Sequence, residues 1–164
     1  MVAAAIGVAH ICASCGSPDL SNKITFPTVS RVYPADSLGG QVMAELVSSF
    51  NYTQVAVIAR NDAWGVGIMG QFIRSSQALG LEIVSAAQFD EDQSDPLETL
   101  STIKTSGARI IISFVFDCNR FFAAAEELEM TAPRYLYFGG PGWPLTPWTD
   151  ATREHMRGSL MMNQ

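Results

Sequence analysis

Histidine and positive charge are both scarce in this sequence. Its 164 residues include 2 histidines, and 10 lysines and arginines stand against 16 aspartates and glutamates, for a formal net charge of −6. Because a chain this acidic has no basic stripe to neutralise phosphates, we expect no nucleic-acid partner. No Ser/His/Asp order and no carboxylate pair stands out either, so nothing in the sequence indicates an enzyme.

Long hydrophobic runs are also missing. No apolar segment approaches the roughly 20 residues that a membrane span needs. The apolar residues 2–12 lack the positively charged start and the cleavage pattern of a signal peptide, so we expect any anchor or secretion signal to lie outside this chain. Yet 48% of the residues are hydrophobic and 16% are charged. This composition excludes disorder and suits one α/β domain with a real core.

Cysteine is rare, and the three cysteines cannot all pair within the chain. Cys12 and Cys15 have C-x-x-C spacing, which is compatible with redox or metal chemistry, whereas Cys118 is isolated. There is no second C-x-x-C pair, so we expect neither a metal site nor a redox role, and the cysteines leave the compartment open. The sequence Asn-Tyr-Thr at 51–53 is a glycosylation sequon, which is compatible with secretion.

Strand and helix patterns alternate along the chain, with short, turn-rich connections between them. The predicted strands are residues 8–12, 54–59, 81–85, 108–116, 135–138 and 158–162, and the predicted helices are the end of one at 2–6, then 36–50, 64–79, 96–107 and 118–130. This alternation predicts a doubly wound, mainly parallel α/β sheet. Because the strand at 8–12 is apolar and needs a sheet, we expect the chain to begin inside a domain.

Acidic residues are expected to begin the helices. Asp95 is predicted to cap a helix that has Pro96 at its first position, and Asp117 is predicted to cap the next helix. The acidic run 90–95 is expected to be a solvated loop. Asp36 or Ser37 is the predicted cap of the helix at 36–50, whose expected apolar stripe is Leu38, Val42 and Leu46, with Met43 and Val47 beside it.

Residues 65–70 match the dinucleotide-binding pattern G-x-G-x-x-G, and Asp90 lies twenty residues further on. A phosphate-binding turn needs its first glycine directly after the strand, so that the helix N-terminus meets the pyrophosphate. Here residues 60–64 intervene and place the glycines inside a helix. We therefore expect no cofactor and interpret the glycines as small residues that permit close packing. A nucleotide-dependent oxidoreductase remains an alternative.

Two groups of segments point to a ligand site. The turn-rich stretch 14–36 carries hydroxyl residues, glycine and proline, which suit a surface where backbone N–H groups meet a small anion. In doubly wound sheets, ligands bind outside the carboxyl ends of the strands. Those ends carry residues 60–64, 116–117 and 139–143, which include two tryptophans and a phenylalanine.

The stretch 14–36 also resembles a known family. It contains Ser-Pro-Asp-Leu-Ser-Asn at 17–22, Phe-Pro-Thr at 26–28, Arg31, and Pro-Ala-Asp at 34–36. These pieces are similar to the extracellular ligand-binding (ANF receptor-type) family, which has the type I periplasmic-binding-protein fold. Within it they look most like class C G-protein-coupled receptors, and GABA type B receptors in particular. The match continues through residues 108–111 and the Gly-Trp pair at 142–143.

The resemblance implies half of a two-lobed clamshell that closes on an amino acid or a similar small molecule. Residues 1–35 would be a remnant of lobe 1 and the hinge, and residues 36–164 would be lobe 2. The chain would belong to the extracellular part of a plasma-membrane receptor, able to dimerise and joined to the membrane through a segment absent here. The alternatives are a periplasmic amino-acid-binding protein of an ABC transporter and a ligand-silent, dimerising subunit.

The same resemblance implies particular ligand contacts. Ser14 and Gly16 match positions that grip the ligand's acid group, and Tyr33 matches a residue that touches it. Asp36 matches an aspartate near the ligand amine, and glutamate receptors have a second aspartate where Pro141 stands here. The aromatic contacts implied are Trp64, Phe116 and Trp143. Alternatives from the residues alone are a helix cap for Asp36, core positions for Phe116 and Trp143, and a turn for Ser14.

Overall fold

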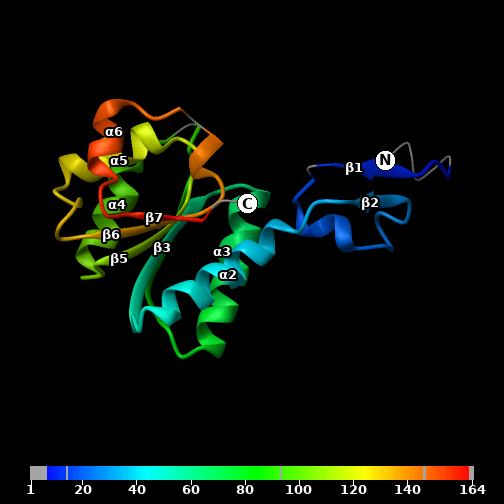
Figure 1. The fold of residues 1–164 in the computed structure, drawn as a ribbon, viewed down its shortest axis with the longest axis horizontal. Helices are drawn as coiled ribbons and strands as arrows, with labels where there is room; N and C mark the ends of the chain where they lie inside the picture. Colours follow the sequence, from blue (N-terminus) through cyan, green and yellow to red (C-terminus); the bar gives the residue numbers. More distant parts are fainter. Residues whose placement is uncertain (1–6, 14, 93, 146, 163–164) are drawn as a thin grey trace.

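The computed structural model describes residues 7–13, 15–92, 94–145 and 147–162, which form two separate parallel sheets (Figure 1). The small sheet consists of β1 (His10–Cys12) and β2 (Val29–Arg31). The main sheet has the strand order β4-β3-β5-β6-β7, and its members are β3 (Gln54–Arg60), β4 (Glu82–Phe89), β5 (Ile110–Phe114), β6 (Leu136–Gly139) and β7 (Leu160–Met161).

Helices cover both faces of the main sheet, which confirms the predicted doubly wound α/β fold. Every neighbouring strand pair in the sheet is parallel. One core lies between the sheet and the first two helices, and a second core lies beneath the later helices. The helical segments are η1 (Pro18–Ser21), α2 (Asp36–Ser49), α3 (Ala63–Ala78), α4 (Pro96–Thr105), α5 (Cys118–Glu127), η2 (Trp143–Leu145) and α6 (Asp150–His155).

The central strand β3 shows why the sheet forms. Its side chains alternate between the two cores: Val57 packs on the side of α2 and α3, and Ile58 packs on the side of α4 and α5. Both are fully buried. Burying each such side chain stabilises the fold by about 1.5–3 kcal/mol, so a strand without polar alternation is stable only between two helical layers.

Side-chain caps fix where four of the helices begin, namely α3, α4, α5 and α6. Asp95 accepts a hydrogen bond from the Leu97 amide, and Asp117 accepts one from the Arg120 amide, as predicted. The prediction for α2 was wrong. Its N-cap is Ala35, which makes no side-chain cap, and Asp36 is the first helical residue. An acid in the first turn still interacts favourably with the helix dipole.

The predicted buried face of α2 was also partly wrong. Leu38 and Val42 are exposed, and the buried side chains are those of Met43, Ala44 and Val47. The reason is the neighbouring helix. A Cβ at Gly40 would lie 2.3 Å from the Ile68 carbonyl oxygen, so the glycine lets α3 approach α2 closely from that side. The packing partner, rather than the stripe of largest side chains, decides which face is buried.

The strand predicted at 8–12 exists but is not buried. β1 pairs only with β2 among the described strands, and Ile11 on β1 is 72% exposed. Cys12 and Cys15 form a disulfide at the end of this strand, whereas Cys118 is free and buried in the main domain. The helix end predicted at 2–6 lies outside the described residues.

The G-x-G-x-x-G glycines lie inside α3, as the sequence predicted. A Cβ at Gly65 would lie 2.1 Å from the Arg60 carbonyl oxygen, so this glycine permits close packing of the helix on the end of β3. Asp62, the N-cap of α3, accepts the Gly65 amide. The first turn of α3 is therefore capped by the Asp62 side chain.

Candidate functional site

The carboxyl ends of β3 and β5 form a topological switch point. β3 lies between β4 and β5, and the chain continues from β3 to β4 on one side and from β5 to β6 on the other. The helices after these strands, α3 and α5, pack on opposite faces of the sheet. The loops that follow β3 and β5 consequently diverge, and ligands of doubly wound folds bind in the crevice so formed.

A pocket of about 270 Å³ opens at this point. Four residues of the seven predicted from the sequence resemblance line it together, although they come from three separate segments of the chain. The lining residues are Tyr33, Asp36, Trp64, Phe116, Pro141, Gly142 and Leu145. The lining is mainly aromatic and aliphatic, with one carboxylate and no lysine or arginine.

Asp36 supplies the charge of the pocket and packs against Gly16. The Asp36 amide donates a 2.8 Å hydrogen bond to the Gly16 carbonyl. A Cβ on Gly16 would lie 1.9 Å from a carboxylate oxygen of Asp36, so no larger residue fits there without displacing the acid. Burial raises the pKa of the Asp36 carboxyl above its ordinary value, against the opposing charge of Arg31. Gly16 is thus beside the pocket rather than among its lining residues.

Trp64 and Phe116 form the aromatic wall of the pocket. Their ring centroids lie 4.5 Å apart, with the planes tilted by 44°. Gly142 allows the loop after β6 to lie on this wall, because a Cβ there would be 2.4 Å from the Phe116 ring. A wall of this kind suits an apolar group or an ammonium, which gains about 0.5–2 kcal/mol over an aromatic face.

An ion-pair cluster centred on Arg60 contacts this wall, and sequence reasoning missed it. The Arg60 guanidinium lies 4.6 Å from the centroid of the Phe116 ring and pairs with Asp62 at 2.8 Å and with Glu91. Burial alone would lower the pKa of Arg60, but its bonds to both carboxylates outweigh burial and raise it. Glu91 belongs to the run predicted to be solvated, and that prediction was wrong for this residue, which is 5% exposed.

A family model described as the receptor family ligand binding region matches residues 1–164. The chain belongs to this family. The resemblance identified in the sequence is therefore confirmed at the level of the family. No described helix is long and apolar enough to cross a membrane.

Several members of the receptor family are similar to this chain. Metabotropic glutamate receptor 8 of Homo sapiens is 27% identical over 133 residues, which are 77% of this chain and 14% of that receptor. Metabotropic glutamate receptor 4 of Macaca fascicularis is 27% identical over 139 residues. Gamma-aminobutyric acid type B receptor subunit 1 of Mus musculus is 24% identical over 134 residues, 80% of this chain and 14% of the receptor.

Of the six predicted site residues that the structure describes, Gly16 and Trp143 are not among the pocket's lining residues. Trp143 is fully buried, and its indole N–H donates a 3.0 Å hydrogen bond to the Ser113 hydroxyl, which is the core alternative considered above. Its neighbour Gly142 faces the pocket instead. Ser14 lies outside the described residues. Leu145 was not predicted, because nothing in its local sequence marks it as facing a cavity.

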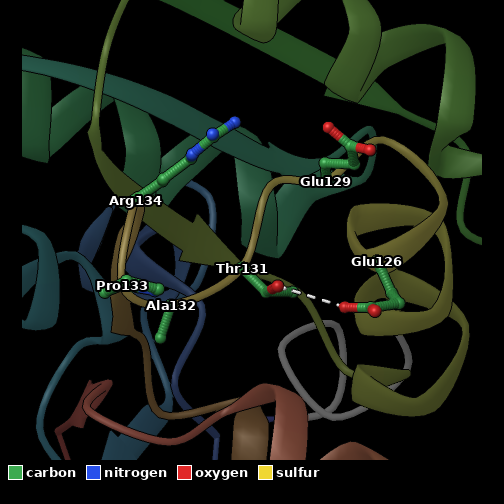
Figure 2. A pocket seen from close by; sticks show the side chains of 6 residues that line it. All are labelled: Glu126, Glu129, Thr131, Ala132, Pro133 and Arg134. Atoms are coloured by element: carbon green, nitrogen blue, oxygen red, sulfur yellow. Dashed lines mark hydrogen bonds between the residues drawn. The ribbon is translucent and has the colours of Figure 1, made fainter.

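A second cavity, of about 330 Å³, lies between the end of α5 and the start of β6 and shares no lining residue with the first pocket. Figure 2 shows Glu126, Glu129 and Arg134 around it, with the Thr131 hydroxyl bonded to Glu126 at 3.1 Å. It contains none of the residues that the resemblance to the receptor family implies. The described residues form no group of three His, Cys, Asp or Glu side chains that could hold a metal ion.

Proposed function

We propose that this chain is the lobe 2 half of a ligand site that closes on an amino acid or a similar small molecule. The observation that carries the proposal is the pocket itself. Tyr33, Asp36, Trp64 and Phe116 line one hollow at the switch point of the sheet. The family match and the similarity to glutamate and GABA type B receptors support the same assignment.

The contrast between the two sheets supports a division of the chain into lobes. We assign residues 1–35 to lobe 1 and the hinge, and residues 36–164 to lobe 2. Supporting this, apolar side chains of the small sheet and its turns, such as Ile11 and Ile24, are exposed, as expected for strands that pack on further parts of a lobe. In the whole protein, Gly16 and Ser14 would then face the pocket from the hinge.

The lining residues support an amine-bearing ligand. Asp36 is the one carboxylate of the pocket, and the aromatic wall beside it favours an ammonium or an apolar group. Pro141 replaces the second aspartate that glutamate-type receptors use, so the amine meets a single acid. We propose that the ligand's own acid group is bound on the hinge side, by Ser14, Gly16 and Tyr33.

We further propose that this chain is a fragment of the extracellular ligand-binding domain of a GABA type B-like class C receptor. A ligand that contacts both lobes binds the closed form more tightly and shifts the population towards it. In a receptor dimer, the closure of the lobes would then be transmitted to a membrane segment outside this chain.

Calorimetry on a chain extended at its N-terminus tests the proposal. The panel pairs amino acids with matched acids that lack the amine: L-glutamate with glutarate, and γ-aminobutyrate with butyrate. We expect an amine-bearing member to bind, and Asp36→Asn to weaken it about 10-fold or more, as loss of a charge-assisted bond of 1.5–3 kcal/mol implies. The control Glu45→Gln removes an exposed charge from the same helix. Equal weakening of acid and amino acid would contradict the role of Asp36.

A further inference from the structure

The buried carboxylate of Glu91 connects the ends of three strands at the pocket. Glu91 follows β4, its carboxylate accepts a hydrogen bond from Arg60 at the end of β3, and a second oxygen faces the loop after β5. That oxygen accepts the amides of Phe116 at 2.8 Å and Asp117 at 2.6 Å. An ionised acid suits this place because Asp117 is the N-cap of α5, where the helix dipole is positive.

Arg60 links Glu91 to the aromatic wall of the pocket. Its guanidinium pairs with Glu91 and Asp62 and lies over the Phe116 ring. The same ring contacts Trp64 in the pocket. Phe116 is thus held through its backbone amide by Glu91 directly and through its ring by Glu91 acting on Arg60. The segment carrying Glu91 is itself anchored, because Arg120 donates to the Glu91 carbonyl at 2.8 Å.

We propose that Glu91 is a positioning residue of the ligand site, which sets the place of Phe116 against Trp64 without touching the ligand. The inference rests on the proposed function, since the wall matters only if a ligand meets it. A charge this buried is costly unless its partners are retained, and two of the partners of its carboxylate, Arg60 and the Phe116 amide, lead to the pocket wall. The carboxylate therefore acts through Arg60 and the two amides.

Near-ultraviolet circular dichroism of the full chain tests this without a ligand, because two rings in a fixed contact give a band that a mobile pair does not. The contribution of Trp64 is obtained by subtracting the spectrum of Trp64→Phe. We expect Glu91→Gln, which keeps the shape but removes the charge that holds Arg60, to lose most of this band while far-ultraviolet dichroism still shows a cooperative melt. A folded Glu91→Gln chain with an unchanged Trp64 band would overturn the proposal.

The matched control is Asp92→Asn. Asp92 is the next residue and contacts the same Arg60, but at 3.4 Å and with its side chain 78% exposed. We expect this variant to keep the Trp64 band, and an equal loss in both variants would overturn the proposal. In a Phe116→Leu background the band should already be absent, and adding Glu91→Gln should change nothing more. A further change there would show that Glu91 acts by another route.

Arg60→Lys keeps the proposal falsifiable if Glu91→Gln does not fold. Lysine retains a cation for Glu91 but lacks the planar group that lies over the ring. We expect a folded chain with a reduced Trp64 band, and an intact band would refute the route through Arg60. Because no ligand is used, these results and the calorimetric panel can fail independently of each other.

Discussion

The small sheet and the main sheet are both parallel, yet different forces stabilise them. The main sheet is covered on both faces, and its two cores contain nearly all the buried apolar side chains of the described chain. Among the described residues of the region 7–35, Val29 is the one buried apolar side chain, and this region is held together by local polar contacts and the disulfide. Arg31, for example, donates to the Ser17 carbonyl at 2.7 Å.

This difference locates the site at the border between the two regions. Trp64 and Phe116 come from the main domain and are fixed by its strands, whereas Tyr33 comes from the segment that leads out of the small sheet. Asp36 stands at the junction, with its amide bonded to Gly16. A wall that follows the strands of the main sheet thus faces a segment held mainly by local contacts, which supports the hinged site proposed above.

Truncating one large apolar side chain in each region tests the contrast most strongly. Phe122 is fully buried and packs edge-on against Phe121, Tyr137 and Trp143. Phe122→Ala should lower the free energy of unfolding by about 3–5 kcal/mol in urea titrations followed by circular dichroism. Ile24 is 96% exposed, so Ile24→Ala should stay within about 0.5 kcal/mol. Comparable losses would mean that the small sheet has a core of its own.

Helix capping gives a smaller, pH-dependent contrast. Burial alone would raise the pKa of Asp62, but the Gly65 amide and the Arg60 guanidinium outweigh burial and lower it below the ordinary 3.8. A depressed pKa stabilises the fold above the unfolded value, and this stabilisation is lost as pH falls through the folded value. Asp62→Ala should cost about 0.5–2 kcal/mol at neutral pH.

Unfolding in urea at neutral pH and near pH 3 checks this prediction. The difference in the free energy of unfolding between wild type and Asp62→Ala should become smaller in acid. Asp19→Ala is the counterpart in the small-sheet region, where Asp19 is exposed in η1. It should change stability little at either pH. A gap for Asp62→Ala that is constant with pH would mean that its ionisation does not stabilise the fold.

The features that the sequence predicts well are those set by neighbouring residues. The strands at β3 and β5 follow from apolar runs, and the caps at Asp95 and Asp117 follow from an acid directly before a helical pattern. The exposed Leu38 and the buried Glu91 could not be found in this way. Their environment is decided by distant partners: α3 packs on the glycine side of α2, and Arg60 meets Glu91 from another strand.

The same distinction applies to the candidate site. Trp64 and Phe116 follow strand ends, so the fold class alone places them at one edge of the sheet. Trp143 also follows a strand end, but it turns inward because the Ser113 hydroxyl on β5 accepts its indole N–H. Which of two neighbouring aromatic positions faces a pocket depends on such single contacts across the sheet, and no local pattern reports them.

The cysteines provide the finest contrast between the regions, because two lie in the small-sheet region and one lies in a core. Cys118 is fully buried. Burial, with the negative charges of Glu91 and Asp117, raises the pKa of its thiol to about 12, against a hydrogen bond with Trp148. Only the thiolate reacts with disulfide reagents, so Cys118 should be inert in the folded chain at pH 8. Cys12 and Cys15 are disulfide-bonded and half-buried.

Free thiols can be counted with Ellman's reagent and by mass after iodoacetamide labelling. The expected number differs between the folded, the unfolded and the reduced chain. The folded, unreduced chain should show none, and the unfolded, unreduced chain should show Cys118 alone. After mild reduction, the folded chain should react at Cys12 and Cys15 while Cys118 stays unlabelled and the melting of the main domain is nearly unchanged. Labelling of Cys118 in the folded chain would show that the start of α5, which Glu91 holds through the Asp117 amide, opens more readily than its buried contacts imply.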